Sequence, residues 1–149
     1  MIVECEVTRK NQHAGDADAL LYTPLKAGLT MKHSRIYDFD FEGDAAALME
    51  FARAVLVDEV SQEMSADKAP AVQGALFHID YSMKPGALDL EKEAIMNYYR
   101  GRSGDAFVLR QLHIAQRIYI FGSGDVAALS ARFVKDIVNP AIHKHQVIV

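Results

Sequence analysis

The sequence predicts an α+β fold of two tandem ferredoxin-like units, each ordered strand, helix, strand, helix, strand. The first observation behind this prediction is an internal repeat: Arg-Ile-Tyr, then Gly-Asp, then an alanine-rich run occur at residues 35–48 and again at 117–129. Self-similarity of this kind is typical of duplicated structural units. The second observation is that strand-period and helix-period segments alternate in each half of the chain. Elements in this order form antiparallel sheets with the helices on one face.

The predicted domain boundaries follow from the repeat. Unit 1 is expected at residues 1–66, a linker at 67–74 and unit 2 at 75–149. The linker contains Asp67, Lys68 and Pro70, which are typical of a connecting segment. Each unit has about 75 residues, a size at which the core of a single domain is marginal. We therefore expect the two units to pack together.

Composition excludes several classes of function. The chain of 149 residues is 50% hydrophobic and 24% charged, and its net charge is −4 with no run of lysine or arginine. The electrostatic footprint of a nucleic-acid-binding protein is therefore missing, and no apolar run approaches the roughly 20 residues that span a bilayer. The N-terminus lacks the basic start and apolar core of a signal peptide, and the single cysteine, Cys5, fits a reducing compartment. We expect a cytoplasmic protein with no nucleic-acid or membrane partner.

Two elements are predicted at the start of the first half. Residues 2–8 alternate between apolar and acidic, which predicts a strand whose acidic face, with Glu4 and Glu6, lies in water. Asp16 is then expected to cap a helix. Pro24 is expected to break that helix, because an interior proline removes a backbone hydrogen bond and clashes with the preceding turn.

The next strand of the first half is predicted at residues 34–42, where aromatic and acidic residues alternate. Its aromatic face is expected to face helices, and Asp38 and Asp40 lie on its other face. Asp44 is expected to cap the following helix, whose apolar residues recur at spacings of three and four. Residues 58–64 are expected to return as a short strand.

The second half is predicted to repeat this order with clearer helix boundaries. Its expected elements are a strand at 76–82, a helix that Asp89 caps and Gly101 ends, a strand at 113–121, a helix after Gly124-Asp125, and a final strand at 143–149.

The two copies differ on one strand face. Where the first copy has Asp38 and Asp40, the matching face of the second copy has Ile118 and Ile120. A strand that is apolar on both faces is normally covered on both. We therefore expect the open face of the sheet in unit 2 to pack against unit 1.

The sequence contains no recognisable catalytic constellation. Phosphate-binding glycine loops, Gly-x-Ser-x-Gly and dinucleotide fingerprints are missing. Residues 38–43 copy the start of a calcium loop, but the closing position holds Met49 rather than glutamate. His143 and His145 would share a strand face, yet no cysteine or acidic residue nearby in sequence completes a metal site. Cys5 is expected to be a small buried hydrophobe rather than a nucleophile. We therefore expect no catalytic or metal-binding residues.

Segments of the second half carry a family resemblance. Tyr81-Ser-Met-Lys-Pro-Gly-Ala-Leu-Asp-Leu-Glu-Lys-Glu-Ala-Ile, Arg117-Ile-Tyr-Ile-Phe and Phe133-Val-Lys-Asp-Ile-Val-Asn-Pro-Ala-Ile-His are similar, in order, to the opening, the middle strand and the close of the PurS family. In that family's opening, a strand ends in Lys-Pro-Gly and Leu-Asp starts a helix. The resemblance covers residues 76–149, and it departs from the family pattern at Gln116-Arg117, where Gly-Lys is usual. The first half resembles the family only in its later part.

The resemblance implies a structural role in purine biosynthesis. PurS is the small non-catalytic component of phosphoribosylformylglycinamidine synthase, a glutamine- and ATP-dependent amidotransferase, and it bridges the glutaminase and the synthetase. The expected partners are therefore glutaminase and synthetase subunits or domains of one synthase, and a homo-oligomer remains open. No cofactor is expected on this chain, since ATP, magnesium and glutamine would belong to the partners.

The family has no catalytic residues to transfer, so the expected site residues are interface residues. They lie at the strand–helix corner and on the middle strand: Lys84, Pro85, Gly86, Asp89, Arg117 and Tyr119. For Gly86 and Asp89, a turn glycine and a helix cap are equally good interpretations. Arginine and tyrosine are enriched in protein interfaces, which favours Arg117.

Two other functions stay open. Tandem strand–helix–strand units can also form ACT-like regulatory modules that bind amino acids, and Gly15 or Gly86 could supply the glycine-bearing loop that such a module needs. A small ferredoxin-like enzyme would need convergent polar groups in a pocket, which spacing alone does not assemble.

Overall fold

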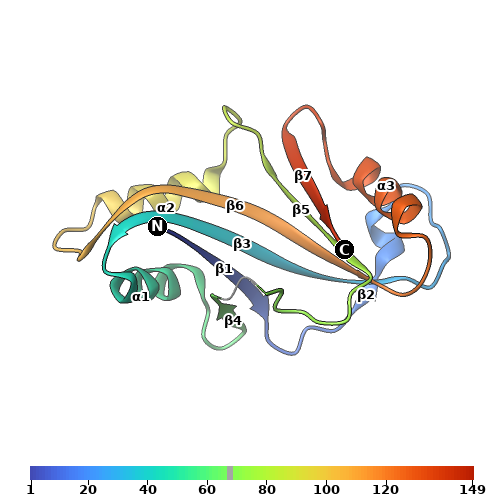
Figure 1. Cartoon of the computed structure of the whole chain (residues 1–149), viewed down its shortest axis with the longest axis horizontal. Coiled ribbons are helices and arrows are strands. Elements are labelled where there is room, and N and C mark those ends of the chain that lie inside the picture. The colour runs from blue at the N-terminus through green and yellow to red at the C-terminus, as the bar shows by residue number, and fades with distance from the viewer. Residues whose placement is uncertain (67–68) are drawn as a thin grey trace. The chain divides into compact units, whose positions relative to one another are not determined.

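A computed structural model describes residues 1–66 and 69–149, and within them the chain has an α+β fold (Figure 1). Three α-helices accompany an antiparallel sheet of seven strands in this described part. The strands are β1 (Ile2–Arg9), β2 (Gly15–Asp16), β3 (Thr30–Gly43), β4 (Gln62–Ser65), β5 (Phe77–Met83), β6 (Phe107–Phe121) and β7 (His143–Ile148). The helices are α1 (Ala45–Leu56), α2 (Leu90–Arg100) and α3 (Val126–Ile137), with a short 3₁₀ helix, η1 (Ala17–Leu20).

The strands follow the order β4-β1-β3-β6-β5-β7, and β2 pairs with β3 outside this path. Pairing is antiparallel in each half: β1 lies between β3 and β4, and β5 lies between β6 and β7. The predicted fold class is therefore confirmed at the level of an antiparallel α+β sheet.

Packing groups the chain into two compact units that are not the sequential halves. Unit 1 contains Met1–Lys10, Arg35–Ala71 and Leu88–Ile114, and unit 2 contains Asn11–Ser34, Val72–Ala87 and Ala115–Val149. The physical reason is the length of β3 and β6, which have 14 and 15 residues, whereas globular strands usually have about 5–6. Each of these strands supplies residues to both units. Asp67 and Lys68, at the start of the expected linker, lie outside the described residues.

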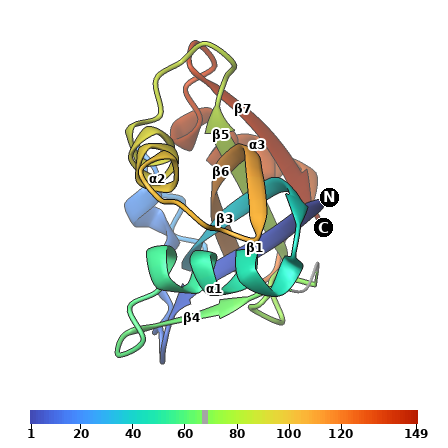
Figure 2. The same ribbon diagram turned by 90° about the vertical axis from the view of Figure 1, so that its left-hand side faces the viewer.

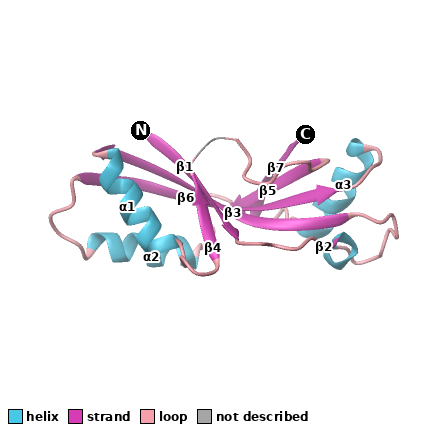
Figure 3. Cartoon of the chain, turned by 90° about the horizontal axis from the view of Figure 1, so that it is seen from below, coloured by secondary structure: helices cyan, strands magenta, loops and turns pink. Residues whose placement is uncertain are grey.

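Unit 1 buries its core between α1, α2 and the sheet (Figures 2 and 3). The aromatic face predicted for β3 is buried as expected, since Tyr37 is 3% exposed and Phe39 and Phe41 are 0% exposed. Phe51 of α1 packs edge-on against Tyr99 of α2, with ring centroids 5.9 Å apart. Helices from opposite halves of the sequence thus share one core.

Unit 2 buries a separate core between its strands, α3 and η1. Phe77 of β5 and Phe133 of α3 lie with ring centroids 6.3 Å apart. Ile118 and Ile120 belong to the same buried cluster as Phe133. Their expected place on the face away from the helices is therefore wrong: they lie on the helix-covered side.

The two Arg-Ile-Tyr segments accordingly occupy opposite strand faces in their own units. Tyr37 packs into the helix-covered core of unit 1. In unit 2 the residue of the segment that packs into the helix-covered core is Ile118, not Tyr119. The difference comes from the missing residue in the second copy, because Tyr37 and Ile118 each stand seven residues before a helix-capping aspartate. A shift of one residue moves every side chain of a strand to the other face.

Aspartate caps begin all three α-helices, as predicted. Asp44 accepts from Ala46 N at 3.0 Å, Asp89 from Lys92 N at 3.1 Å and Asp125 from Ala127 N at 3.2 Å. Such caps satisfy backbone donors that have no partner within the helix. The end of α2 at Gly101 is also as predicted.

The helix predicted after Asp16 is largely wrong. Asp16 caps only the four residues of η1, because the next carboxylate competes for the backbone: Asp18 accepts from Leu25 N and Lys26 N, each at 3.1 Å. Aspartate commonly favours such local loop bonds over helix. Pro24, inside this loop, is also unsuited to a helix interior.

Glu6 corrects the expected water-facing side of β1. Its residue is only 2% exposed, and its carboxylate accepts from Ala71 N at 3.1 Å. Within unit 1, segment 69–71 therefore supplies a backbone donor to an acidic side chain that the alternating pattern placed in water.

None of the described helices is long and apolar enough to cross a membrane.

Candidate functional site

The expected interface corner between β5 and α2 is an ordered turn. Ala87 N donates to Lys84 O at 3.0 Å, which places Pro85 and Gly86 at the two central positions. Gly86 has φ of +90°, as the third residue of a type II turn requires, and proline is common before it. Lys84, Pro85 and Gly86 are exposed, so this corner in unit 2 offers an open surface.

Lys84 also connects this corner to the segment before β7. Its backbone N donates to Ile142 O at 2.8 Å, and its Nζ donates to Pro140 O at 2.6 Å. Asp89 belongs to unit 1 and serves as the cap of α2. The structural interpretation of Asp89 as a helix cap, which the sequence already allowed, is thus confirmed.

Arg117 and Tyr119 lie on the face of β6 opposite the helix-covered core of unit 2. Asp80 of β5 is the cross-strand partner of Arg117, and the two form an ion pair with Nε–Oδ1 at 2.7 Å and Nη2–Oδ2 at 2.8 Å. The side chains are only 6% and 17% exposed. Two parallel bonds between a guanidinium and a carboxylate fix both distance and orientation.

Aromatic rings flank this ion pair. The Arg117 guanidinium lies 5.9 Å from the centroid of the Tyr119 ring, and the Tyr119 ring lies 5.3 Å from that of His78, its cross-strand partner. His78, Arg117 and Tyr119 are 6%, 5% and 0% exposed. The Asp80–Arg117 cluster is therefore buried and fixed in place. Arg117 and Tyr119 are not exposed on this chain, as residues of a docking surface would be.

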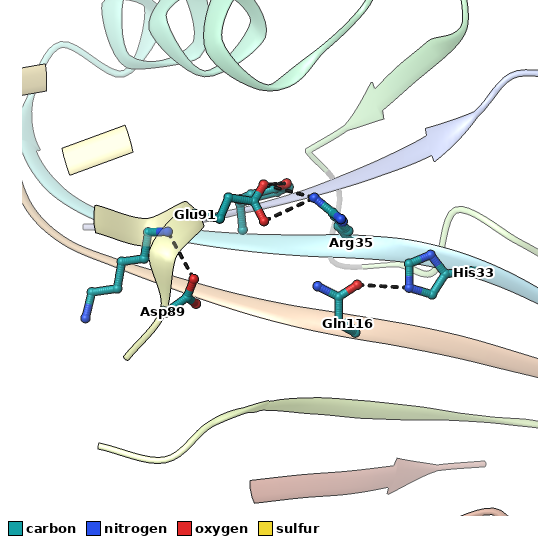
Figure 4. A network of polar contacts seen from close by, with 7 residues as sticks. His33, Arg35, Asp89, Glu91 and Gln116 are labelled. Carbon is teal, nitrogen blue, oxygen red and sulfur yellow. Dashed lines mark hydrogen bonds and ion pairs between the residues drawn. The ribbon is translucent and has the colours of Figure 1, made fainter. Parts of the chain in front are cut away.

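A second polar cluster, in unit 1, contains the other Arg-Ile-Tyr copy (Figure 4). Arg35 Nη1 donates to both carboxylate oxygens of Glu91 at 3.1 Å, and the Tyr37 hydroxyl donates to Glu91 Oε1 at 2.6 Å. Burial, followed by the hydrogen bond to Glu91, raises the pKa of Tyr37. The hydrogen bond with Tyr37 raises the pKa of Arg35. The Glu91 cluster thus fastens the first turn of α2 to β3.

Figure 4 also shows a pair inside unit 2. His33 Nε2 and Gln116 Oε1 lie 2.9 Å apart. Gln12 fixes the backbone of His33 on both sides, accepting from its N at 2.7 Å and donating to its O at 2.9 Å. The Gln116 side chain therefore connects β6 to β3 within unit 2.

Cys5 is the buried hydrophobe that its pattern predicts. It is 0% exposed, and burial, with Asp38 adding to it, raises the pKa of its thiol to about 11. The thiolate is the reactive form, so Cys5 is protected at neutral pH.

The candidate metal motifs have other arrangements. Residues 38–43 lie in the extended strand β3 and not in a loop. The His143 ring packs against Tyr81 with centroids 5.1 Å apart, and its Nδ1 accepts from Asn139 N at 3.1 Å. In segments 1–66 and 69–149 no three His, Cys, Asp or Glu side chains gather as a metal site would require.

The sequence pointed to Arg117 and Tyr119, but it did not indicate Asp80 as the partner of Arg117, nor the pairing of Arg35 with Glu91. Asp80 is the only acidic residue of β5, but its pairing with Arg117 depends on strand register. Comparison with known proteins adds no assignment, because no family model, curated protein or solved structure matches the chain.

Proposed function

We propose that this chain is a non-catalytic assembly component of phosphoribosylformylglycinamidine synthase that bridges its glutaminase and ATP-dependent synthetase. One observation carries the proposal: the segment that resembles the PurS opening folds in the order that the resemblance implies. β5 ends at Met83, Lys84 to Ala87 form the turn, and Asp89 caps α2. Sequence pattern and local structure therefore agree over this segment.

The strand order supports two tandem PurS-like units as the finer architecture. β4-β1-β3 comes from the first half of the chain and β6-β5-β7 from the second. Each half places its first strand between its other two, and the order of one half mirrors that of the other. Duplication of a strand–helix unit gives such a mirrored order when the two middle strands become neighbours.

The polar chemistry of the chain supports an assembly role. Arg35 and Arg117, the arginines of the two Arg-Ile-Tyr segments, each form an ion pair with a carboxylate of their own unit. Catalytic groups would belong to the partners, together with the sites for ATP, magnesium and glutamine. The exposed corner at Lys84, Pro85 and Gly86 is the proposed contact surface on this chain.

Co-elution tests the proposal. The purified chain is mixed with the glutaminase and the synthetase of the same organism, with ATP and glutamine present, and resolved by size-exclusion chromatography. We expect one complex that contains all three components, and glutamine-dependent synthase activity that requires the chain. Independent elution, with activity unchanged when the chain is left out, would contradict the proposal.

The open turn at Gly86 also favours a second candidate, an ACT-like ligand-sensing module. A Cβ built at Gly86 would meet no atom within 4 Å, so the backbone of this turn is accessible to a small ligand. A thermal-shift screen with amino acids and nucleotides separates the two functions. A ligand at 100 times its dissociation constant adds about 2.7 kcal/mol to the free energy of unfolding, whereas the assembly role requires no such shift.

A further inference from the structure

Two turns of unit 2 are bonded to each other at one end of the β5–β7 pair. The turn at residues 84–87 follows β5, and the turn at residues 139–142 precedes β7 (Figure 1). Lys84 joins them, because its backbone N donates to Ile142 O at 2.8 Å and its Nζ donates to Pro140 O at 2.6 Å. The exposed residues of this surface, which we call the two-turn tip, are Lys84, Pro85, Gly86, Pro140, Ala141, Ile142 and Lys144.

The two-turn tip is fixed by its own hydrogen bonds. In the second turn, Asn139 Oδ1 accepts from Ala141 N at 3.0 Å, and Asn139 O accepts from Ile142 N at 3.1 Å and from His143 N at 2.8 Å. The first turn is closed by the bond from Ala87 N to Lys84 O at 3.0 Å. A surface that is ordered before binding loses little conformational entropy when a partner docks on it.

An apolar side chain lies between the two lysines of the tip. The β5–β7 register pairs Ser82 with Lys144 and Met83 with His143, so the next pair along is Lys84 and Ile142. Ile142 is 40% exposed and does not belong to the buried cluster of unit 2. It therefore has Lys84 opposite it and Lys144 two positions along the chain, in the arrangement of an apolar centre with a charged rim.

The charge of the tip is opposite to that of the chain as a whole. Segments 82–87 and 139–146 contain two lysines, at positions 84 and 144, two histidines and no acidic residue, whereas the whole chain has a net charge of −4. The two-turn tip is therefore a basic island on an acidic protein.

The acidic residue that precedes each of these segments is already paired within unit 2. Asp80 forms the two short bonds to Arg117, and Asp136 lies 3.7 Å from Arg132 Nε. Both pairings leave the positive charge of Lys84 and Lys144 available to a partner.

We propose that the two-turn tip docks on an acidic protein surface, with carboxylates of the partner beside Lys84 and Lys144 and an apolar side chain on Ile142. The inference rests on the proposed function, which supplies the glutaminase and the synthetase as partners. Complementary charges at an interface steer association and reject wrong partners. Nucleic acid fits the tip less well, since its binding requires many phosphate contacts and the net charge of −4 opposes a polyanion.

Rate measurements test the charged rim. Stopped-flow fluorescence gives the association and dissociation rates of the chain with labelled glutaminase and with labelled synthetase, each at low and at high salt. We expect Lys84→Glu and Lys144→Glu each to slow association with at least one of the two by about tenfold and to reduce its salt dependence, with little change in dissociation.

Lys10→Glu is the matched control for both charge reversals. Lys10 is exposed in unit 1 and, like Lys84, donates from Nζ to a backbone carbonyl, that of Glu59 at 2.7 Å. The variant has the same net charge as the other two, so any general effect of charge appears in all three. Circular dichroism verifies that each variant is folded.

The apolar centre has a different kinetic signature. Ile142→Ser should accelerate dissociation by about tenfold while association stays near the wild-type rate, because short-range contacts act mainly on the lifetime of a complex. Val60→Ser is its control, since Val60 is 88% exposed in unit 1, and it should leave both rates unchanged.

The outcomes separate this inference from the proposed function. Wild-type chain that binds neither subunit would contradict the proposed function and overturn the inference with it. Wild-type binding that Lys84→Glu and Lys144→Glu weaken no more than Lys10→Glu does would overturn the inference alone. A labelled DNA duplex that binds the wild type, and is released by Lys144→Glu but not by Lys10→Glu, would also overturn it, because the tip would then be a polyanion site.

Discussion

Arg117 and Asp80 face each other across β6 and β5 and share two hydrogen bonds, of 2.7 and 2.8 Å, with both side chains largely buried. The pair holds only in the observed register, in which Ile79 lies opposite Ile118 on the other face. A slip of one residue would separate the charges and move the isoleucines out of the core.

Removing one partner of this pair should be costly. We expect Arg117→Met and Asp80→Asn each to lower the free energy of unfolding by about 3–5 kcal/mol, because each leaves a buried polar or charged group without its counterpart. Urea denaturation measures this loss. The double variant Asp80→Leu/Arg117→Met should lose less than the sum of the two, since neither charge is then buried alone.

The exposed pair of Arg110 and Glu42 provides a control for that prediction. Their side chains are 54% and 63% exposed, and the hydrogen bond with Arg110 lowers the pKa of Glu42. Solvent screens such pairs, so Arg110→Ala should leave the urea midpoint nearly unchanged. If Arg110→Ala lowered the free energy of unfolding as much as Arg117→Met does, the buried pair would have no special role in stability.

Tyr37→Phe removes the hydroxyl that donates to Glu91 at 2.6 Å. We expect a loss of about 1–3 kcal/mol in the free energy of unfolding, because a hydrogen bond to a charged group is lost at a residue that is 3% exposed. Tyr98→Phe is the matched control, since that ring is 55% exposed. Unfolding monitored by circular dichroism should separate the two variants; identical stabilities would refute the structural role of the Glu91 cluster.

Cys5 makes stability fall at alkaline pH. Its folded-state pKa is raised to about 11 from the ordinary value of 9.0, so the unfolded state releases its proton first. The contribution is complete below pH 9.0 and is lost as pH rises toward about 11. The free energy of unfolding of Cys5→Ala, although lower at pH 7, should decline less steeply through this window than that of the wild type.

Alkylation provides an independent readout of the same residue. With iodoacetamide at neutral pH, the native protein should react no faster than it unfolds, because the thiol is protonated and buried. Urea should accelerate the reaction in parallel with unfolding. Rapid labelling of the folded protein would show that Cys5 is accessible.

The turn at Gly86 tests the proposed contact with the synthase. Gly86→Asn adds a side chain to the exposed corner, and asparagine tolerates the positive φ of +90° better than most residues. We expect the affinity for the glutaminase–synthetase pair to fall by about tenfold, as measured by co-elution or calorimetry.

Gly104→Asn is the matched variant for this comparison. Gly104 has φ of +79°, and a Cβ there also meets no atom within 4 Å. Both variants should lose similar, small amounts of stability, and only Gly86→Asn should lose affinity. Equal affinities of the two variants would remove the corner from the proposed interface while leaving the co-elution test unaffected.

Sequence reasoning predicted the elements whose signals are local. The caps at Asp44, Asp89 and Asp125 and the buried aromatic face of β3 were all evident from spacing. The 3₁₀ helix after Asp16 was not, because the carboxylate of Asp18 binds amides seven and eight residues away along the chain.

Contacts between distant segments account for the other differences. Glu91 and Arg35 are 56 positions apart, and no periodicity reports such a pairing. The repeat gave a wrong alignment of the two strands. Aligning the two Arg-Ile-Tyr segments pairs Tyr37 with Tyr119, whereas aligning the helix caps Asp44 and Asp125 pairs Tyr37 with Ile118. The two Arg-Ile-Tyr segments therefore turn different residues, Tyr37 and Ile118, toward their cores.

The composition of unit 1 has a consequence for synthesis on the ribosome. Its core includes Phe107 and Ile114, so the aromatic face of β3 cannot be fully covered until residue 114 has been made. At about 5–20 residues per second, the nascent chain exposes that face for several seconds. Asp38 and Asp40 alternate with the aromatic residues there, and interspersed charges of this kind oppose β-aggregation. We therefore expect Asp38 and Asp40 to oppose aggregation of the nascent chain while this face of β3 is still uncovered.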